Sequence, residues 1–293
     1  MSALPATPGD IRRRRPEWSP WLAVVEAVVR EIGATPWDTA VPDRDRVRAA
    51  AGPLVGGAEI AVPRLVVRRL LGRLVRTASD SGAPKMAALR RALEPAPDVL
   101  ALFAASVRQD GAPAARAAAD TDADPEAFAA VVALLAVPFL HACRRRWSAS
   151  VPESWVEGYC PVCASWPAFT EVRGIERSRH HRCGRCGGDW HARLLRCPYC
   201  ATADHDGLVT LAPEAGGSHA TIDACRRCHG YVKTFTRLQG CAPEAVLFED
   251  MASVDLDLAA LGQGFARPAG AARAFDVAVS DNGSPRRFLA WRT

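Results

Sequence analysis

The sequence lacks any uninterrupted apolar run of the roughly 20 residues that cross a bilayer as a helix. Charges or prolines break its longest apolar stretches. We also expect no export signal, because Glu17, Pro20 and Glu26 interrupt the apolar stretch after the arginines at 12–15, and no small-residue cleavage site follows. We therefore expect a cytoplasmic protein without membrane insertion, in which these arginines flank a core helix.

A strong charge of either sign is also missing. The 37 lysines and arginines exceed the 32 acidic residues by five among 293 residues, and almost all of the basic residues are arginine. This mild excess allows an acidic partner but is well short of the charge of a protein that coats nucleic acid. Hydrophobic residues make up 49% of the chain, and at this length two domains are expected.

Cysteine is absent from the first 142 residues and abundant after them. Eight of the ten cysteines form four Cys-x-x-Cys pairs, which are Cys160/Cys163, Cys183/Cys186, Cys197/Cys200 and Cys225/Cys228. Without a secretory signal, such thiols are expected to bind metals or to do redox chemistry rather than to form structural disulfides. A thioredoxin-type pair would need a βαβ pattern, which no pair has. The haem-type spacing of "CRRCH" at 225–229 is interpreted as coincidence beside the other pairs.

The cysteine-free part is predicted to be helical. Ser19 and Pro20 suit an N-cap and a first turn, and Asp124 is predicted to cap a later helix that Pro138 kinks or restarts. From Pro63, apolar residues alternate at helical spacing with the arginines Arg64, Arg68, Arg69, Arg73 and Arg76. This arginine stripe is most simply the solvated face of a core helix. The alternative is a surface that receives an acidic segment of a partner.

After Pro152, short alternating stretches such as "SHATIDAC" lie between the cysteine pairs and predict short strands. In a metal knuckle both sulfurs of a pair face one ion, and two knuckles on adjacent hairpins complete a tetrahedral S4 site. Gaps of 19 and 24 residues favour sequential pairing, with one site of Cys160, Cys163, Cys183 and Cys186 and a second of Cys197, Cys200, Cys225 and Cys228. A nested arrangement stays open, because only ten residues separate Cys186 from Cys197.

A site saturated by four thiolates offers no coordination position to water or substrate, so it does not indicate hydrolytic catalysis. No nucleophile and base constellation is evident elsewhere, and we expect no enzyme. Four thiolates suit zinc and also mononuclear iron in a rubredoxin-like geometry. We expect the nearby basic residues to offset the charge of the sites; these are Arg182, Arg185, Arg193, Arg196, Arg226, Arg227 and Lys233. His229 is interpreted first as a turn residue.

The sequence resembles the formate dehydrogenase accessory proteins of the FdhE family. The resemblance is carried by "GYCPVCASWP" at 158–167, "CGRCGGDWHARLLRCPYC" at 183–200, "CRRCHGYVKTF" at 225–235 and "FEDMASVDLDLAALGQGF" at 248–265. Ala164 and Ala201 stand where glycine is expected after a knuckle. The segment from about 270 to 293 has no counterpart in the resemblance, and the roles of Cys143 and Cys241 stay open, with buried, inert thiols expected.

The resemblance implies a cytoplasmic maturation factor that binds the catalytic subunit of an exported molybdenum or tungsten formate dehydrogenase and does not oxidise formate itself. It implies two metal ions held by the eight cysteines, with iron favoured over zinc. The expected fold is α+β, with an N-terminal all-α domain at 1–155, tandem rubredoxin-like or zinc-ribbon β modules at 156–245, and a C-terminal helix and tail at 246–293. The tract around Asp250, Asp255 and Asp257 is expected to be a helix with a solvated acidic face.

Two other functions remain open at this point. A zinc ribbon that binds nucleic acid would place aromatic side chains among its basic positions for base stacking. The aromatics beside the knuckles are instead expected to form small ribbon cores; they are Trp166, Trp190, Tyr199, Tyr231 and Phe235. A rubredoxin-like electron carrier would need a reversible iron couple.

Overall fold

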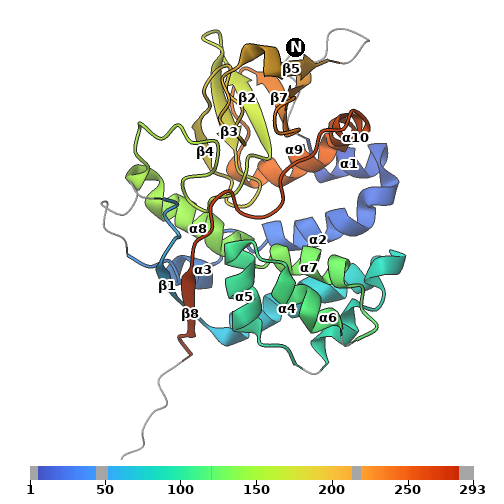
Figure 1. The fold of residues 1–293 in the computed structure, drawn as a ribbon. Coiled ribbons are helices and arrows are strands. Elements are labelled where there is room, and N and C mark those ends of the chain that lie inside the picture. Colours follow the sequence, from blue (N-terminus) through green and yellow to red (C-terminus); the bar gives the residue numbers. More distant parts are fainter. Residues whose placement is uncertain (1–5, 44–51, 95, 120, 213–218, 284–293) are drawn as a thin grey trace, which may run out of the picture.

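The structure is a computed structural model, and it describes residues 6–43, 52–94, 96–119, 121–212 and 219–283. A six-stranded sheet lies at one end of the molecule and most of the helices at the other (Figure 1). The α-helices described are α1 (Pro8–Arg14), α2 (Ser19–Val29), α3 (Thr35–Thr39), α4 (Arg64–Ser79), α5 (Val99–Arg108), α6 (Ala112–Ala119), α7 (Pro125–Ala133), α8 (Val137–Trp147), α9 (Val246–Ala252) and α10 (Val254–Gly262). The fold is therefore mixed, as the α+β prediction requires.

Local sequence signals explain several helix starts. The Asp124 side chain accepts a hydrogen bond from the Ala127 amide and caps α7 as predicted, and Pro138 lies in the first turn of α8, so it restarts the helix. Ser19 does not act as an N-cap. A 3₁₀ turn at Pro16–Trp18 runs directly into α2, which places Ser19 at φ −52° and ψ −38° inside the helix rather than in the extended conformation of a cap.

One helical stretch differs from the expectation that no segment suits a membrane. Residues Pro125–Ser150 are long and apolar enough to cross a bilayer by length and composition. The prolines and arginines that seem to break this segment in the sequence lie at the start of α8 and in its last turn. In the structure, 67% of its most apolar window is buried inside the protein, as in the core helix of a globular domain.

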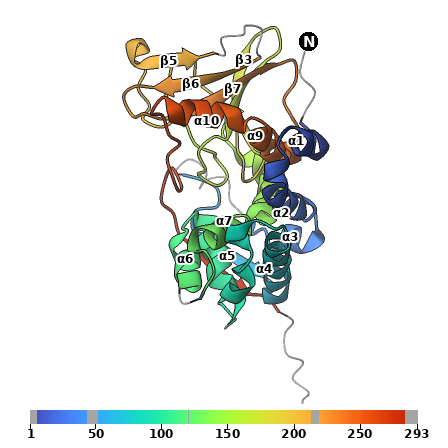
Figure 2. The same ribbon diagram turned by 90° about the vertical axis from the view of Figure 1, so that its right-hand side faces the viewer.

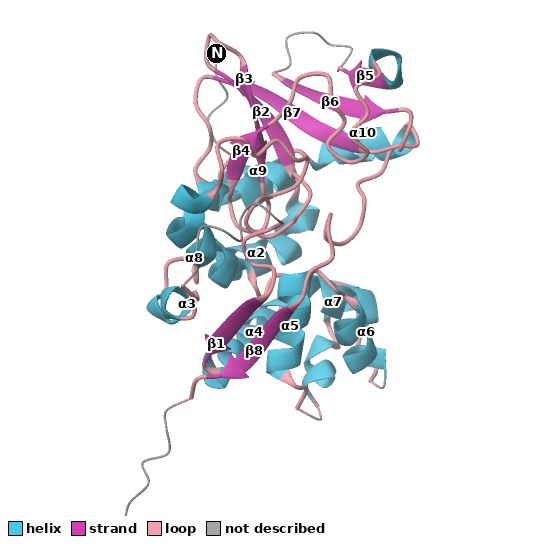
Figure 3. Cartoon of the chain, turned by 60° about the vertical axis from the view of Figure 1, so that its left-hand side comes forward, coloured by secondary structure: helices cyan, strands magenta, loops and turns pink. Residues whose placement is uncertain are grey.

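The N-terminal part is not purely helical, which corrects the all-α prediction. Strand β1 (Ala58–Val62) pairs in parallel with β8 (Val277–Asp281), from the segment predicted to be only helix and tail (Figure 3). Ala58, Ile60 and Val62 point inward from β1, and the residues between them are exposed. Three small or branched residues on a five-residue strand give a weak pattern, and the partner strand lies more than 200 residues away. The sequence of β1 therefore indicates a strand only weakly, and it does not indicate that β8 is the partner strand.

The larger sheet consists of two three-stranded modules. Its strands are β2 (Phe169–Arg173), β3 (Ser178–Arg182), β4 (Asp189–His191), β5 (Leu208–Leu211), β6 (Ala220–Cys225) and β7 (Tyr231–Arg237). The order is β4-β3-β2-β7-β6-β5, with antiparallel pairing inside each module. A parallel pair, β2 with β7, joins the modules in the register Phe169 to Lys233. In chain order, each module consists of a Cys-x-x-Cys pair, two strands, a second Cys-x-x-Cys pair and a third strand. The two modules therefore form a tandem repeat.

Helices α9 and α10, with α1, lie between this sheet and the remaining helices (Figure 2). Lys233 of β7 is fully buried, and its Nζ lies 2.7 Å from Asp250 Oδ1 and 2.9 Å from Asp257 Oδ2. Arg267 bridges the same two carboxylates at 2.9 and 2.7 Å. The prediction of a solvated acidic face is therefore wrong for Asp250 and Asp257, which neutralise a buried lysine and dock the helices onto the sheet.

One continuous hydrophobic core links the helices with the first module. It includes core residues of α2, α4, α5, α7 and α8 together with Cys160, Cys163, Cys183, Cys186 and Trp190. The backbone also crosses between the two parts, since the amides of Leu54 and Val55 donate to the carbonyls of Pro161 and Val162 at 2.8 and 2.9 Å. The domain boundaries at 155 and 245 stay predictions, and the first module shares its packing with the helices.

Candidate metal centres

All four Cys-x-x-Cys segments adopt the same backbone turn. In each, the amide of the first cysteine donates to the carbonyl of the residue five positions later, at 2.9 to 3.0 Å. The residue four positions after the first cysteine has a left-handed backbone; these residues are Ala164 (φ 56°), Gly187 (φ 68°), Ala201 (φ 58°) and His229 (φ 55°). In the Cys183 knuckle the amides of Arg185 and Cys186 also point at the Cys183 sulfur at 3.4 Å.

This turn explains both the glycine pattern and its exceptions. A left-handed backbone favours glycine, because a Cβ there crowds the following carbonyl. At Gly187 a Cβ would also lie 2.6 Å from that of Pro243 and 2.8 Å from Cε1 of His141, so this position excludes a side chain. Ala164, Ala201 and His229 adopt the same conformation at an energetic cost, and His229 is the turn residue that the sequence predicted.

The eight sulfurs gather in two groups of four, in the sequential arrangement predicted. Cys160, Cys163, Cys183 and Cys186 form the first cluster, and Cys197, Cys200, Cys225 and Cys228 form the second. Within each group the sulfurs lie within 4.8 Å of one another. The closest pairs are Cys160 to Cys186 at 3.4 Å and Cys163 to Cys183 at 3.5 Å in the first cluster, and Cys197 to Cys228 at 3.6 Å and Cys200 to Cys225 at 3.8 Å in the second. The structure thus groups the sulfurs in the sequential and not in the nested arrangement.

This spacing fits a tetrahedral ion. Metal–sulfur bonds of about 2.3 Å require sulfur–sulfur edges of about 3.8 Å. The closest sulfur–sulfur distances lie at or slightly below that value and all lie within 4.8 Å, so each cluster could hold one metal ion. Burial raises the pKa of the Cys160 and Cys186 thiols well above that of an exposed cysteine, so a cation must displace their protons. The donor set suits zinc and iron alike.

The two clusters differ in their exposure. All four cysteines of the first cluster are completely buried, whereas in the second cluster Cys228 is exposed and Cys200 is half-buried. The first cluster lies where the sheet meets the helices, and Arg185 secures that junction. Its guanidinium donates to the Ser106 carbonyl at 2.6 Å and to that of Ala133 at 3.3 Å, near the ends of α5 and α7.

Two of the basic residues expected to offset the sulfur charge do something else. Arg182 is buried and its Nη1 lies 3.0 Å from Oε2 of the buried Glu171, while Lys233 pairs with the aspartates of α9 and α10. Arg237 also approaches Glu171, at 3.4 Å. The carboxylates that pair with Arg182 and Lys233 lie 11 to 24 residues away along the chain, so the proximity of these cations to cysteines in the sequence was misleading.

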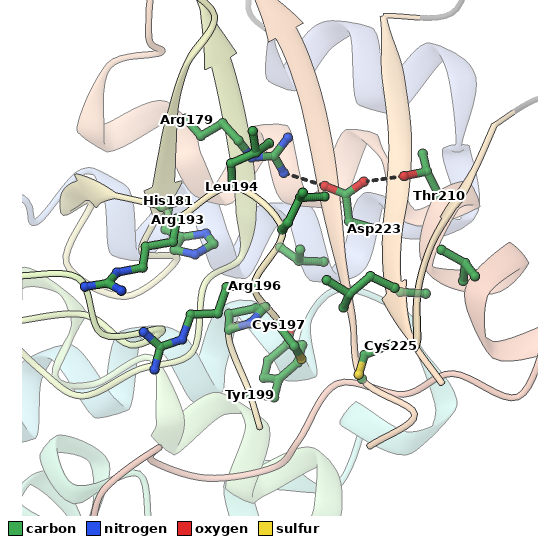
Figure 4. Close-up of a pocket in the computed structure, with 18 residues that line it drawn as sticks. Arg179, His181, Arg193, Leu194, Arg196, Cys197, Tyr199, Thr210, Asp223 and Cys225 are labelled. Atoms are coloured by element: carbon green, nitrogen blue, oxygen red, sulfur yellow. Dashed lines mark hydrogen bonds and ion pairs between the residues drawn. The ribbon is translucent and has the colours of Figure 1, made fainter. Parts of the chain in front are cut away.

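A small pocket of about 200 Å³ opens beside the second cluster (Figure 4). Asp223 lies on its wall, where Arg179 Nη2 donates to it at 2.5 Å and Thr210 Oγ1 at 3.1 Å. His181, also on the wall, is buried and hydrogen-bonds Thr170 through Nδ1 at 2.9 Å, and burial lowers its pKa to about 3. No sequence motif marks these residues, because three strands and the linker at 192–196 bring them together only in the fold.

Both lone cysteines are buried, as predicted. Cys143 lies in α8 within the main core, and Cys241 follows β7. Burial raises the pKa of Cys241 to about 12, which disfavours the reactive thiolate.

Comparisons with known proteins give one kind of relative. No family model matches the chain. The chain is 35% identical over 118 residues to a protein named FdhE homolog from Aquifex aeolicus, which covers 39% of this chain and 40% of the relative. It is 32% identical over 111 residues to the FdhE homolog of Yersinia enterocolitica, which covers 37% of this chain and 35% of that protein. These matches span well under half the length of the curated relatives.

The likeness in fold extends further along the chain. The crystal structure of the FdhE protein from Pseudomonas aeruginosa superimposes with a TM-score of 0.52 at 20% identity, covering 92% of this chain and 97% of that one. The resemblance that the cysteine motifs predicted is thus confirmed: the chain is similar to FdhE proteins in sequence over part of its length and in fold over nearly all of it.

Proposed function

We propose that this protein is a cytoplasmic accessory factor for the maturation of a respiratory formate dehydrogenase and is not itself an enzyme. The observation that carries the proposal is the first four-cysteine cluster, which is fully buried in the core that joins helices and sheet. A closed S4 site has no open coordination position and stabilises folding, as expected of a scaffold. The relatives are named FdhE, and the resemblance to that family supplies the enzyme that this scaffold would serve.

The eight cysteines of the two clusters are proposed to hold two metal ions. Iron is favoured over zinc on the resemblance to the FdhE family, since the paired knuckles by themselves suit either ion. The partner is proposed to be the catalytic subunit of a molybdenum or tungsten formate dehydrogenase, bound before that subunit is exported.

The proposal is tested by purifying the protein without oxygen from cells that make formate dehydrogenase. We expect two metal ions per chain and co-purification of the catalytic subunit. In a deletion strain, formate oxidation should be lost while the enzyme's polypeptides are still made, and the wild-type gene should restore it. Cys183→Ser should fail to restore it, and the control variant Ser280→Ala, at an exposed serine of β8 outside both clusters, should succeed. Normal formate oxidation in the deletion strain would refute the proposal.

A second candidate function, electron transfer, is favoured by the exposure of Cys228 in the second cluster. A metal near the surface exchanges electrons more readily than a buried one, so the second cluster is the candidate site of electron transfer. Voltammetry of the iron-loaded protein should give a reversible wave if it carries electrons. The wave should be lost in Cys228→Ser, and its absence in the wild-type protein removes this function.

A function in binding nucleic acid receives less support. Trp166 packs edge-to-face on Tyr199 with ring centroids 5.1 Å apart, and Trp190 is buried, so these rings are occupied by packing rather than free for base stacking. A salt-dependent gel shift with random DNA would revive this function.

A further inference from the structure

The exposed face of α4 carries a basic groove. A cavity of about 440 Å³ lies along this helix, and its lining includes Arg68, Arg69, Arg73 and Arg76. The opposite wall contains Leu93, Pro97 and Val99, from the segment that leads into α5. This face holds most of the arginine stripe, for which the helical spacing in the sequence most simply predicted a solvated helix surface. A hollow with one cationic and one apolar wall is a more specific feature than a solvated stripe.

The charge of the groove is largely unneutralised within the protein. Arg73 pairs with Glu31 of the segment after α2. Arg68, Arg69 and Arg76 are exposed, and among the residues that the structure describes no carboxylate lies within 4.0 Å of them. Three arginines crowded on about two turns of one helix repel each other, so an anion between them gains electrostatic energy from all three.

Gly72 makes the hollow. It lies in the middle of α4, lines the groove, and is half-exposed between the arginines. Glycine in a helix interior costs about 1 kcal/mol relative to alanine. A Cβ built at Gly72 would meet only the end of the Arg76 side chain, at 3.2 Å from Nη1, so close packing does not impose glycine here. A larger side chain at this position would instead fill the space between the arginines.

A second hollow continues the groove toward the start of α4. It has a volume of about 260 Å³, and its lining includes Arg64, Leu65, Arg68 and Asp281. The Asp281 carboxylate lies 3.5 Å from Arg64, so Arg64 is already paired there and Arg68 is the cation that this hollow adds to the groove. Arg68 belongs to both hollows, and Leu65 is 54% exposed. From residue 63 to residue 76 the helix rises by roughly 20 Å. This is the length of about six residues of extended peptide or about twelve residues of helix.

The charge of the chain's other segments argues against an occupant from this protein. The segments outside the described residues contain no acidic run: residues 44–51 carry three arginines and one aspartate, residues 284–293 carry three arginines, and residues 213–218 carry one glutamate. Among the described residues that line the two hollows there is no aromatic side chain for base stacking, whereas leucine, valine and proline are present. The groove therefore suits a peptide better than a nucleic acid.

We propose that this groove binds an acidic peptide segment of a partner protein, with carboxylates on Arg68, Arg69 and Arg76 and an apolar side chain in the hollow above Gly72. Identifying the partner as the formate dehydrogenase catalytic subunit rests on the proposed function. Binding of an acidic segment does not.

The binding test uses the full-length protein and fluorescent synthetic peptides of about twelve residues, one repeating Glu-Glu-Leu and one repeating Lys-Lys-Leu. Fluorescence anisotropy should detect the acidic peptide only, with an affinity that falls as salt is raised. Arg68→Glu with Arg69→Glu should weaken binding by at least about tenfold, since two attractive contacts become repulsive. Gly72→Leu should weaken it with every charge retained.

The control is Arg116→Glu with Arg177→Glu, which makes the same change in net charge at two exposed arginines outside the groove. It should bind within about twofold of the wild-type protein. Equal weakening by the control would overturn the proposal, because binding would then follow net charge alone. Wild-type affinity in both groove variants would overturn it too, as would tighter binding of a random DNA oligonucleotide that the groove variants weaken.

Capture of the formate dehydrogenase catalytic subunit separates this proposal from the proposed function. If the groove variants capture the subunit as well as the wild-type protein does, the groove is not its docking site and the maturation function stands. If the acidic peptide binds in the groove and the subunit is not captured by any form of the protein, the groove stands and the proposed function fails.

Discussion

Replacing Ala201 by glycine is expected to strengthen the second cluster. Ala201 has a φ of 58°, in the turn that follows Cys200, and its side chain is exposed. A left-handed backbone costs an alanine about 1–2 kcal/mol. Glycine adopts it freely but loses about 0.5–1 kcal/mol more conformational entropy on folding. The net gain is about 0.5–1 kcal/mol, because an exposed methyl group contributes little burial energy.

The same change at Ala164 should have almost no effect. Ala164 has a φ of 56° in the corresponding turn of the first cluster, but it is completely buried. Removing its methyl group forfeits about 0.8 kcal/mol of burial. This loss offsets the gain from relieving the backbone. The two alanines thus share one conformation and differ in outcome through burial alone.

The assay is metal competition against a chelator, followed with each purified variant. A gain of 0.5–1 kcal/mol corresponds to about two- to fivefold tighter metal retention by the second cluster in Ala201→Gly. Ala203→Gly is the matched control: Ala203 is also exposed, lies two residues away and has no left-handed backbone. It should weaken retention slightly through entropy alone. If Ala201→Gly behaves like Ala203→Gly, backbone strain in the knuckle is not what limits the cluster.

Three further predictions concern metal pairing, buried charge and pH. In native mass spectrometry, the double variant Cys160→Ser with Cys183→Ser should lose one metal, because both residues belong to the first cluster. The double variant Cys160→Ser with Cys225→Ser should lose both metals, because it removes one ligand from each cluster, and the reverse pattern would contradict the sequential arrangement. In urea unfolding, Lys233→Met should lower the free energy of unfolding by about 3 kcal/mol, the low end of the cost of breaking a buried ion pair, because it leaves Asp250 and Asp257 to share the single charge of Arg267. Arg15→Met, in an exposed pair with Asp255, should cost under about 1 kcal/mol. Because the pKa of His181 is lowered to about 3 by burial, the unfolded chain binds one more proton than the folded chain from about pH 6.5 down to pH 3, and stability falls as the pH falls. His181→Gln should reduce that slope by about 1.4 kcal/mol per pH unit.

The features that could be predicted from the sequence are those determined by a few consecutive residues. A Cys-x-x-Cys knuckle needs only six residues, and the repeat of a Cys-Pro-x-Cys pair followed by a second pair correctly gave the composition of both clusters. Helix starts at Asp124 and Pro138 are equally local. In each case the residues that determine the structure are neighbours in the sequence.

The features missed depend on contacts between distant segments. Asp257 lies on a helix that reads as acidic and solvated until Lys233, 24 residues earlier, is placed beneath it. The parallel pairing of β2 with β7 joins strands about 60 residues apart, and no periodicity within either strand encodes the choice of neighbour. The groove on α4 likewise needs Leu93 and Val99 opposite the arginines, which the helical pattern alone could not supply.

The pairing of β1 with β8 has a consequence for the order in which the chain folds during synthesis. Strand β8 begins about 215 residues after β1 ends, so a ribosome adding 5–20 residues per second completes it roughly 10–40 s later. Throughout that interval the edge of β1 that β8 will cover has unsatisfied backbone groups, which can recruit other strands. A strand made about 215 residues later therefore closes the edge that β1 exposes, and a nascent protein that stalls before residue 277 keeps that edge open to aggregation.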